Sequence, residues 1–256
     1  GVSETDLTTY PDATTSFAYT GTSFSVANQD SNPSGIAWDG THFWVVGASN
    51  LVHKYNASGV YQNVNFSVAS QGTSPTDIVW DGTYFWVINN ATSPYKRVSK
   101  YSAAGVYQNV FWEYNAVTTM DGEGLAWDGT YFWVVGNSTD TIRKFNAAGV
   151  DQGVSYSVAA QATNPKGITF DGTYLWVVGT ASGKAHKYNT SGVYQNASFA
   201  VNSQDTSAQG IVSIGTALWT IGKTTDSAYK YQNQIGVDSL TGSNLTRGLQ
   251  NYIRIK

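Results

Sequence analysis

Short apolar segments recur along the chain, and a tight-turn signal separates them. The clearest copy is "AWDGTYFWVVG", Ala126 to Gly136, in which Asp-Gly lies between two apolar segments. The copies are "SGIAWDGTHFWVVG", "TDIVWDGTYFWVIN", "EGLAWDGTYFWVVG", "KGITFDGTYLWVVG" and the degraded "QGIVSIGTALWTIG". Their second Trp falls at 44, 86, 133, 176 and 219. A repeat of about 40 to 50 residues that carries several short strands is typical of a propeller blade.

Each repeat predicts four strands. In the first repeat, "GIAW" and "FWVV" flank the Asp-Gly turn, and "VHKYN" and "VYQNVNFSV" flank a Gly-containing turn in "NASG". We expect Asp-Gly to form a two-residue hairpin in which both residues adopt a positive φ. The run "FWVV" is apolar on both faces, so its sheet should pack between two neighbouring sheets.

The N-terminus predicts how the ring closes. "AYTGTSFSVANQD", Ala18 to Asp30, aligns with "VYQNASFAVNSQD", Val193 to Asp205, which contains a fourth strand. The fifth repeat has a poor fourth strand of its own, so Phe17 to Val26 should complete the fifth blade and remove an open sheet edge. We therefore predict an all-β, five-bladed β-propeller with four antiparallel strands per blade. It spans 17–231, between an N-terminal linker at 1–16 and a C-terminal tail with a terminal strand at 232–256.

Composition narrows the function classes. The chain has 256 residues, no cysteine and 12% charged residues, with a formal net charge of -3. So weak a charge argues against a basic surface for nucleic acid, and no apolar run approaches the ~20 residues of a membrane-spanning helix. Without cysteine there is no thiolate nucleophile and no sulfur-ligated zinc. We expect no cofactor, no metal, no nucleic acid and no membrane insertion.

The repeat "PxGIxWDGTYFWVVG...VxKYNxSGVYQN" resembles the propeller repeats of the NHL and YncE type, whose units begin with Pro-x-Gly-Ile and end in a Gly turn. The resemblance covers about residues 17–231. Five repeats are similar to the lectin propellers of the tachylectin-2 type, which implies carbohydrate binding without assigning ligand residues. The ending "NLTRGLQNYIRIK" and the Thr/Ser/Asn-rich composition resemble bacteriophage tail and other virion-surface proteins. That likeness implies an extracellular or virion-surface location.

One face of such a propeller carries the loops between repeats together with the loops between second and third strands. The loops between repeats are "NQDSNPS", "SQGTSPT", "TTMDGE", "AQATNPK" and "SQDTSAQ", and their polar groups can hydrogen-bond to sugar hydroxyls. Four of them carry the same residue: Gln29, Gln71, Gln161 and Gln204. These loops are either equivalent weak sites that add avidity or ordinary surface turns.

Departures from the repeat point to an asymmetric ligand site. The residue before the first-strand Gly should form a ring at the channel mouth: Ser34, Thr76, Glu123, Lys166 and Gln209. Asp77 replaces that Gly in the second repeat alone. The other departures, on the second and third repeats, are Tyr95, Lys96, Arg97, Met120, Asp121 and Glu123. We predict a ligand-binding patch there, although Glu123 and Lys166, on adjacent blades, can instead pair with each other.

The recurring motif residues have structural interpretations. The turn Asp at 39, 81, 128 and 171 is expected to shape the hairpin, and the second Trp of each repeat to pack between blades. Trp38, Trp80 and Trp127, which become Phe170 and Ser213 in the last repeats, either pack or stack on a sugar.

Catalysis is not expected. The only plausible carboxylates for a glycosidase are Asp77, Asp121 and Glu123, and no histidine accompanies them, because His42, His53 and His186 lie elsewhere in the repeat. We expect a non-catalytic adhesin or receptor-binding module that recognises a cell-surface glycan or receptor. The alternative is a spacer or decoration domain that binds other virion or surface proteins, with contacts made through the termini. A glycoside hydrolase is the third alternative.

Overall fold

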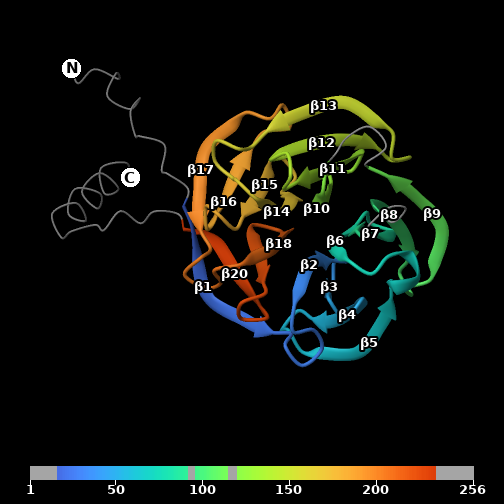
Figure 1. Ribbon diagram of the computed structural model, residues 1–256. Helices are drawn as coiled ribbons and strands as arrows, with labels where there is room; N and C mark the ends of the chain where they lie inside the picture. The colour runs from blue at the N-terminus through green and yellow to red at the C-terminus, as the bar shows by residue number, and fades with distance from the viewer. Residues whose placement is uncertain (1–15, 92–95, 115–119, 235–256) are drawn as a thin grey trace, which may run out of the picture.

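The computed structural model describes residues 16–91, 96–114 and 120–234. Within them, five sheets of four antiparallel strands form a ring, and Figure 1 shows the ring viewed along its axis. The chain is a five-bladed β-propeller. The fold predicted from the repeats is confirmed. Of the predicted linker at 1–16 and the predicted tail at 232–256, residues 1–15 and 235–256 lie outside the described residues, whereas residue 16 and residues 232–234 belong to strands.

Each blade runs from an innermost to an outermost strand. Blade 1 contains β2 (Pro33–Trp38), β3 (His42–Gly47), β4 (Leu51–Asn56) and β5 (Tyr61–Ser67). Blade 2, after the 3-10 turn η1 (Ala69–Gln71), contains β6 (Pro75–Trp80), β7 (Tyr84–Asn90), β8 (Lys96–Ser102) and β9 (Tyr107–Glu113). Blade 3 contains β10 (Gly122–Trp127), β11 (Tyr131–Gly136), β12 (Thr141–Asn146) and β13 (Asp151–Ser157). Blade 4 contains β14 (Pro165–Phe170), β15 (Leu175–Gly179), β16 (Lys184–Tyr188) and β17 (Tyr194–Ala200). Blade 5 contains β18 (Ala208–Ile214), β19 (Ala217–Gly222), β20 (Ser227–Gln234) and, from the N-terminus, β1 (Ser16–Ser25).

The ring closes as the sequence predicts. Strand β1 pairs antiparallel with β20, from Ser16 opposite Gln234 to Ser25 opposite Ser227, and the two strands lie side by side in Figure 1. The aromatic ring of Phe24 then packs between blades 5 and 1, with centroids 5.1 Å from Phe43 and 5.7 Å from Trp219. First and last repeats are therefore joined within one sheet.

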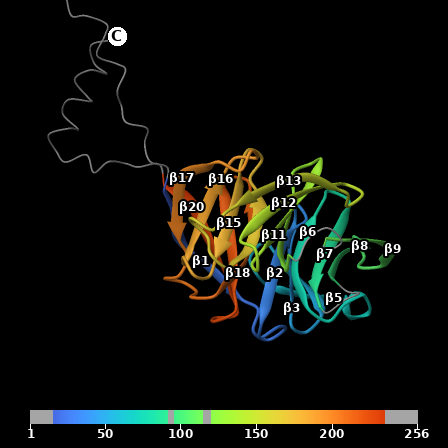
Figure 2. The ribbon, with the colours of Figure 1, turned by 45° about the horizontal axis from the view of Figure 1, so that its top comes forward.

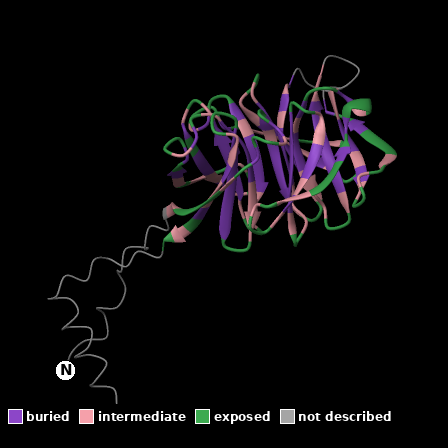
Figure 3. Cartoon of the chain, turned by 90° about the horizontal axis from the view of Figure 1, so that it is seen from below, coloured by how far each residue is buried: buried purple, intermediate pink, exposed green. Residues whose placement is uncertain are grey.

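The core lies between the blades. Five clusters of buried side chains each join two adjacent blades. The second Trp of every repeat belongs to one of them and is at most 6% exposed, which confirms its predicted packing role. The blades stand side by side in the tilted view of Figure 2, and Figure 3 shows buried strand residues between exposed loops.

The innermost strands meet at the axis through glycine. A Cβ added at Gly124 would lie 2.8 Å from the Lys166 carbonyl oxygen, and one at Gly167 would lie 2.7 Å from the Gln209 carbonyl oxygen. A residue with a side chain at Gly124 or Gly167 would therefore collide with the backbone of the next blade. Asp77 takes the glycine position in blade 2, where its carboxylate accepts backbone N–H groups of Ile78 and Leu125, both at 2.9 Å.

The A–B hairpin between first and second strands differs from its predicted form. Asp39 keeps a negative φ, and only Gly40 is positive, at 97°. The Asp39 amide bonds to the His42 carbonyl oxygen at 3.1 Å, so the two loop residues are Gly40 and Thr41. A positive φ at the first loop residue alone is the sign pattern of a type II′ turn. The prediction that Asp and Gly both adopt a positive φ is wrong.

The two ends of the ring carry different loops. On the loop face, the segment between repeats contacts the loop between second and third strands, as in the 3.1 Å bond from Ala48 N to Asn32 O. The opposite end, called the hairpin face here, carries the A–B turns and the C–D turns, which join the third and fourth strands of a blade. No helix in the described part of the chain has the length and apolarity to cross a membrane.

Deletion of residues 1–26 tests the closure. It removes β1 and leaves β20 as an open edge. We expect the free energy of unfolding to fall by at least about 3 kcal/mol, since the deletion removes the fully buried Val26 and the half-buried ring of Phe24 from the core between blades 5 and 1. Urea denaturation measures this loss. The control is deletion of 1–15, which retains β1 and should melt with the parent. Equal stability of both truncations would contradict the closure.

Candidate functional site

The repeated glutamines of the loop face have structural partners. Gln29, Gln161 and Gln204 each accept a hydrogen bond at 3.3 Å from a third-strand tyrosine hydroxyl, those of Tyr55, Tyr188 and Tyr231 respectively. Blade 3 carries Phe145 at this tyrosine position, and its loop has no such Gln. The recurrence of Gln is thus explained by a buried hydroxyl that needs an acceptor.

Blade 2 uses its glutamine differently. The Arg97 guanidinium donates to Gln71 Oε1 at 2.9 Å and to the Gln71 carbonyl oxygen at 3.0 Å, and it lies 4.7 Å from the Phe111 ring centroid. The Tyr101 hydroxyl, which would otherwise reach Gln71, is buried without a hydrogen bond among the described residues. Gln71 and Arg97, both predicted as ligand residues, are therefore brought together.

Four charged residues of the predicted patch form two ion pairs. Lys96 forms an ion pair with Asp121, and Lys166 Nζ lies 3.2 Å from Glu123 Oε2, with both side chains at most 16% exposed. Burial raises the pKa of the Glu123 carboxyl, and the Lys166 ammonium opposes that rise. The anticipated pairing of Glu123 with Lys166 is confirmed, and both charges are largely removed from solvent.

Other members of the predicted patch are interior or undescribed. Asp77 is 1% exposed, and burial raises its carboxyl pKa well above the ordinary value even though backbone amides stabilise the anion. Met120 is fully buried in the core between blades 2 and 3. Tyr95 lies outside the described residues. Of the three carboxylates considered for a glycosidase, Asp77 is therefore buried at the axis, and Asp121 and Glu123 form ion pairs with lysines.

The histidines form no catalytic relay. In blade 1 the Asp30 carboxylate accepts the Ser49 hydroxyl at 2.6 Å, and Ser49 Oγ lies 3.3 Å from His53 Nε2. The Asp30 carboxylate therefore hydrogen-bonds to Ser49. In a Ser–His–Asp relay, the carboxylate hydrogen-bonds to the histidine instead. His186 repeats the Ser contact at 3.2 Å. Within 16–91, 96–114 and 120–234, no three His, Asp or Glu side chains cluster as metal ligands.

The motif aspartates clamp the core tryptophans. Asp39, Asp81, Asp128 and Asp171 each accept the indole Nε1–H of the Trp five residues later, at 2.6–2.8 Å. The second carboxylate oxygen accepts two backbone amides of the same turn, as at Thr130 and Tyr131. Burial alone would raise the pKa of Asp39, but these bonds outweigh burial and hold its pKa below the ordinary value. The structural role is confirmed, although the indole bond was not predicted.

Two further contacts complete the repeated seam between blades. A lysine of the third strand lies over the Tyr that follows the turn, with Nζ 3.7, 3.6 and 3.8 Å from the rings of Tyr84, Tyr131 and Tyr174. The aromatic residue that ends the first strand packs on the Phe of the second strand, as in Trp80 with Phe85 at 4.6 Å. This contact confirms packing for the first-strand tryptophans.

Blade 5 lacks several of these groups. Ser213 replaces the first-strand aromatic, Ile214 the clamping Asp, Ala217 the Tyr and Leu218 the Phe. Phe17 of β1 stacks on Phe199 of blade 4, with centroids 5.2 Å apart. The seam between blades 4 and 5 is therefore built from smaller and different side chains.

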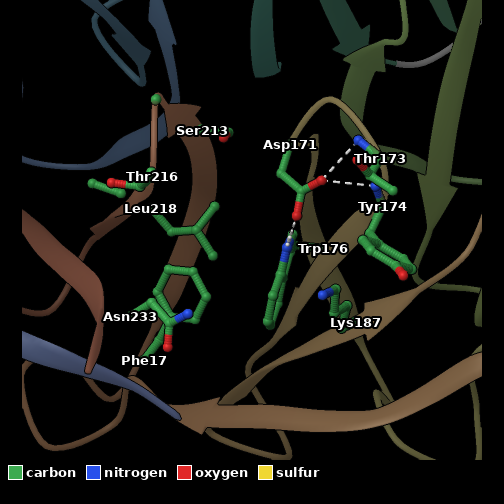
Figure 4. Close-up of a pocket in the computed structure, with 12 residues that line it drawn as sticks. Phe17, Asp171, Thr173, Tyr174, Trp176, Lys187, Ser213, Thr216, Leu218 and Asn233 are labelled. Carbon is green, nitrogen blue, oxygen red and sulfur yellow. Dashed lines mark hydrogen bonds between the residues drawn. The ribbon is translucent and has the colours of Figure 1, made fainter. Parts of the chain in front are cut away.

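These substitutions open a cavity of about 280 Å³ on the hairpin face. Figure 4 shows Asp171, Thr173, Tyr174, Trp176 and Lys187 of blade 4 facing Phe17, Ser213, Thr216, Leu218 and Asn233 of blade 5. We call this cavity the seam pocket. The Asp171 carboxylate already accepts three hydrogen bonds, from Trp176 and from the amides of Thr173 and Tyr174.

The seam pocket combines half-buried rings with polar groups. Phe17 and Tyr174 are only partly buried, and Ser213 and Thr216 contribute hydroxyls. The Oδ1 atom of Asn233 is buried and accepts no hydrogen bond among the described residues. A buried acceptor without a donor is exceptional in a folded protein. The pocket can accommodate a ligand with an apolar face against Phe17 and Tyr174 and hydroxyls beside Ser213 and Thr216.

Sequence reasoning did not place the site here. The replacement of the first-strand aromatic by Ser213 was visible in the aligned repeats, but its effect depends on which side chains blade 4 presents across the seam. The place of Phe17 at this seam likewise follows only once β1 is paired with β20.

No family model matches the chain, and no curated protein matches it. Similar solved structures include glutaminyl cyclase from Myxococcus xanthus, with a TM-score of 0.65, 9% identity, and coverage of 85% of this chain and 96% of that chain. The PQQ-bound aldose sugar dehydrogenase from Streptomyces coelicolor has a TM-score of 0.59 and 12% identity, and the match covers 88% of this chain and 100% of that chain. A nidogen/laminin complex has a TM-score of 0.50 and 14% identity, and the match covers 77% of this chain and 74% of that chain. At these identities the likeness shows the propeller fold alone.

Replacing Asp128 with Ala tests the Trp clamp. The change removes three hydrogen bonds and leaves the buried indole N–H of Trp133 without an acceptor. We expect a loss of about 2–4 kcal/mol in the free energy of unfolding, measured in urea. Thr130→Ala, in the same turn, is the control and should stay within about 0.5 kcal/mol of the parent. Equal losses for both variants would show that the clamp is unimportant.

His186 makes stability depend on pH. Burial, reinforced by Lys184, lowers the pKa of its imidazole from 6.5 to about 4, so the folded protein keeps the ring neutral. The unfolded chain protonates first, so stability falls as the pH decreases from 6.5 to about 4, by up to roughly 3 kcal/mol. Urea denaturation at pH 7 and pH 4.5 should show a smaller acid loss for His186→Gln than for the parent. Identical losses would contradict this role for His186.

Proposed function

We propose that this propeller is a non-catalytic binding module that recognises a glycan through the seam pocket, as part of an adhesin or receptor-binding protein at a cell or virion surface. The observation that carries this proposal is one pocket in which the half-buried rings of Phe17 and Tyr174 lie with the hydroxyl-bearing side chains of Ser213 and Thr216. Sugars present an apolar C–H face and hydroxyl donors, and this pocket offers a counterpart to each.

The state of the carboxylates supports binding without catalysis. Glycoside hydrolysis uses two carboxyl groups on opposite sides of one bond. Asp77 is engaged by backbone amides at the axis, and Asp121 and Glu123 are engaged by lysines. In the seam pocket, Asp171 is the one carboxylate among the lining residues, and its hydrogen bonds are all directed within its own hairpin.

A second candidate function is a spacer or decoration domain that binds other surface proteins. One observation favours it. The valine that follows each C–D turn glycine is 57–61% exposed in blades 1 to 4: Val60, Val106, Val150 and Val193. Val64, Val110 and Phe111, on the outermost strands of blades 1 and 2, are also exposed. Together with the four valines they form an apolar surface at the outer edge of the ring, which a protein partner could cover.

Restoring the missing aromatic tests the glycan proposal. Ser213→Trp gives blade 5 the residue found in blades 1 to 3 and should fill the seam pocket without loss of stability. On a glycan array, we expect the parent to bind and Ser213→Trp to bind at least about tenfold more weakly. Phe170→Trp, at the closed seam between blades 3 and 4, is the matched control and should bind like the parent.

Two outcomes would count against glycan recognition. Binding that survives Ser213→Trp would remove the seam pocket from the proposal. A parent that binds no glycan but binds a companion surface protein firmly, with that binding weakened by Val106→Asp, would favour the spacer function.

A further inference from the structure

A second cavity lies on the other side of blade 5. It measures about 240 Å³ and opens on the hairpin face between blades 5 and 1. Its lining residues are Trp38, Phe43, Ala57, Ile214, Ala217, Trp219 and Lys230. We call it the Lys230 pocket. It exists because blade 5 lacks both the clamping Asp, which is Ile214 here, and the Tyr, which is Ala217 here.

The loss of Asp leaves the blade 5 tryptophan without its acceptor. In blades 1 to 4 a carboxylate oxygen lies 2.6–2.8 Å from the indole nitrogen. The register of blade 5 is the same, with Ser213 opposite Leu218 and Ile214 opposite Ala217. Ile214 therefore occupies the Asp position, and its side chain has no oxygen to accept the indole N–H. Among the described residues, nothing hydrogen-bonds to the Trp219 indole.

The loss of Tyr leaves the blade 5 lysine without its ring. Lys230 lies opposite Trp219 in the β19–β20 pair, as Lys187 lies opposite Trp176. In blades 2 to 4 the ammonium lies within 3.6–3.8 Å of a Tyr centroid, whereas Ala217 provides no ring. No described Asp or Glu lies within ion-pair distance of Lys230. One pocket thus holds an ammonium and an indole N–H that both lack the partners of the other blades.

We propose that the Lys230 pocket binds the carboxylate of a small apolar organic acid. The ligand carboxylate takes the place of the missing Asp side chain: one oxygen accepts the Trp219 indole N–H and the charge is balanced by the Lys230 ammonium. Charge-assisted hydrogen bonds of this kind are stronger than neutral ones. The apolar part of the acid packs on the rings of Trp38 and Phe43, which are 4.8 Å apart. This site is independent of the seam pocket and of the proposed glycan function.

Benzoate is a suitable probe because it joins a carboxylate to an apolar ring. Nitrogen-15 NMR follows the indole N–H signals, and Trp219→Phe identifies that of Trp219. We expect benzoate to shift the Trp219 signal and to leave those of Trp44, Trp86, Trp133 and Trp176 in place, since an Asp already occupies each. Benzyl alcohol, which has the ring but no carboxylate, should cause no comparable shift.

Two variants test the chemistry. Ile214→Asp restores the carboxylate of the other repeats, so it should occupy the indole N–H and weaken benzoate binding at least tenfold, while Ile214→Leu, the matched control, should not. Lys230→Met removes the ammonium and should weaken binding by a similar factor, while Lys187→Met at the seam pocket should leave it unchanged. Thermal melting of each variant establishes that it is folded.

Three results would overturn the proposal. The first is an unchanged Trp219 signal in saturating benzoate. The second is benzoate binding that Ile214→Asp does not weaken in a folded protein. The third is tighter binding of glucuronate than of benzoate, which would assign the pocket to an acidic sugar and remove the apolar acid.

Discussion

Five sheets can share one axis only where their innermost strands approach each other within backbone contact. Glycine at one position of the first strand in blades 1, 3, 4 and 5 allows that approach, and a Cβ at Gly124 or Gly167 would collide with the next blade. From this contact the blades diverge, and the space that opens between them is filled by large apolar side chains of the second strands, such as Trp44 and Phe85 between blades 1 and 2. Asp77 is the exception at the axis. Its side chain is accommodated because its carboxylate bonds to amides of its own blade and of blade 3.

The repeat made most of the fold predictable. Trp at a spacing of 42 to 47 residues, together with the likeness of Ala18–Asp30 to a fourth strand, defined the number of blades and the place of β1. Both signals are visible when the copies of the repeat are aligned, so they can be found without knowledge of the structure. The geometry of the A–B turn was mispredicted, because the same Asp-Gly pair fits two registers of a two-residue loop. In the structure, Asp39 precedes the two loop residues, which are Gly40 and Thr41.

The candidate sites were harder to predict, because their determinants lie on different repeats. Gln29 appears as a polar loop residue until the hydroxyl of Tyr55 is placed against it. The departures at Lys96, Asp121 and Glu123 are conspicuous in the alignment, yet each is offset by an opposite charge on a neighbouring segment. Ser213 and Ile214 are less conspicuous, and their consequence is a space that no alignment of single repeats describes. Both pockets flank blade 5, where the repeat has changed most.

The closure of blade 5 also sets the mechanical properties of the molecule. Because Ser16 lies opposite Gln234, the chain enters and leaves the propeller at adjacent points of one sheet. Tension applied between these two points loads the β1–β20 hydrogen bonds one after another, as in unzipping, and does not shear them together. The other fourteen strand pairs of the ring lie outside that line of force. A pull on the two flanking segments therefore opens the ring at blade 5, the blade that borders both pockets, before it disturbs blades 1 to 4.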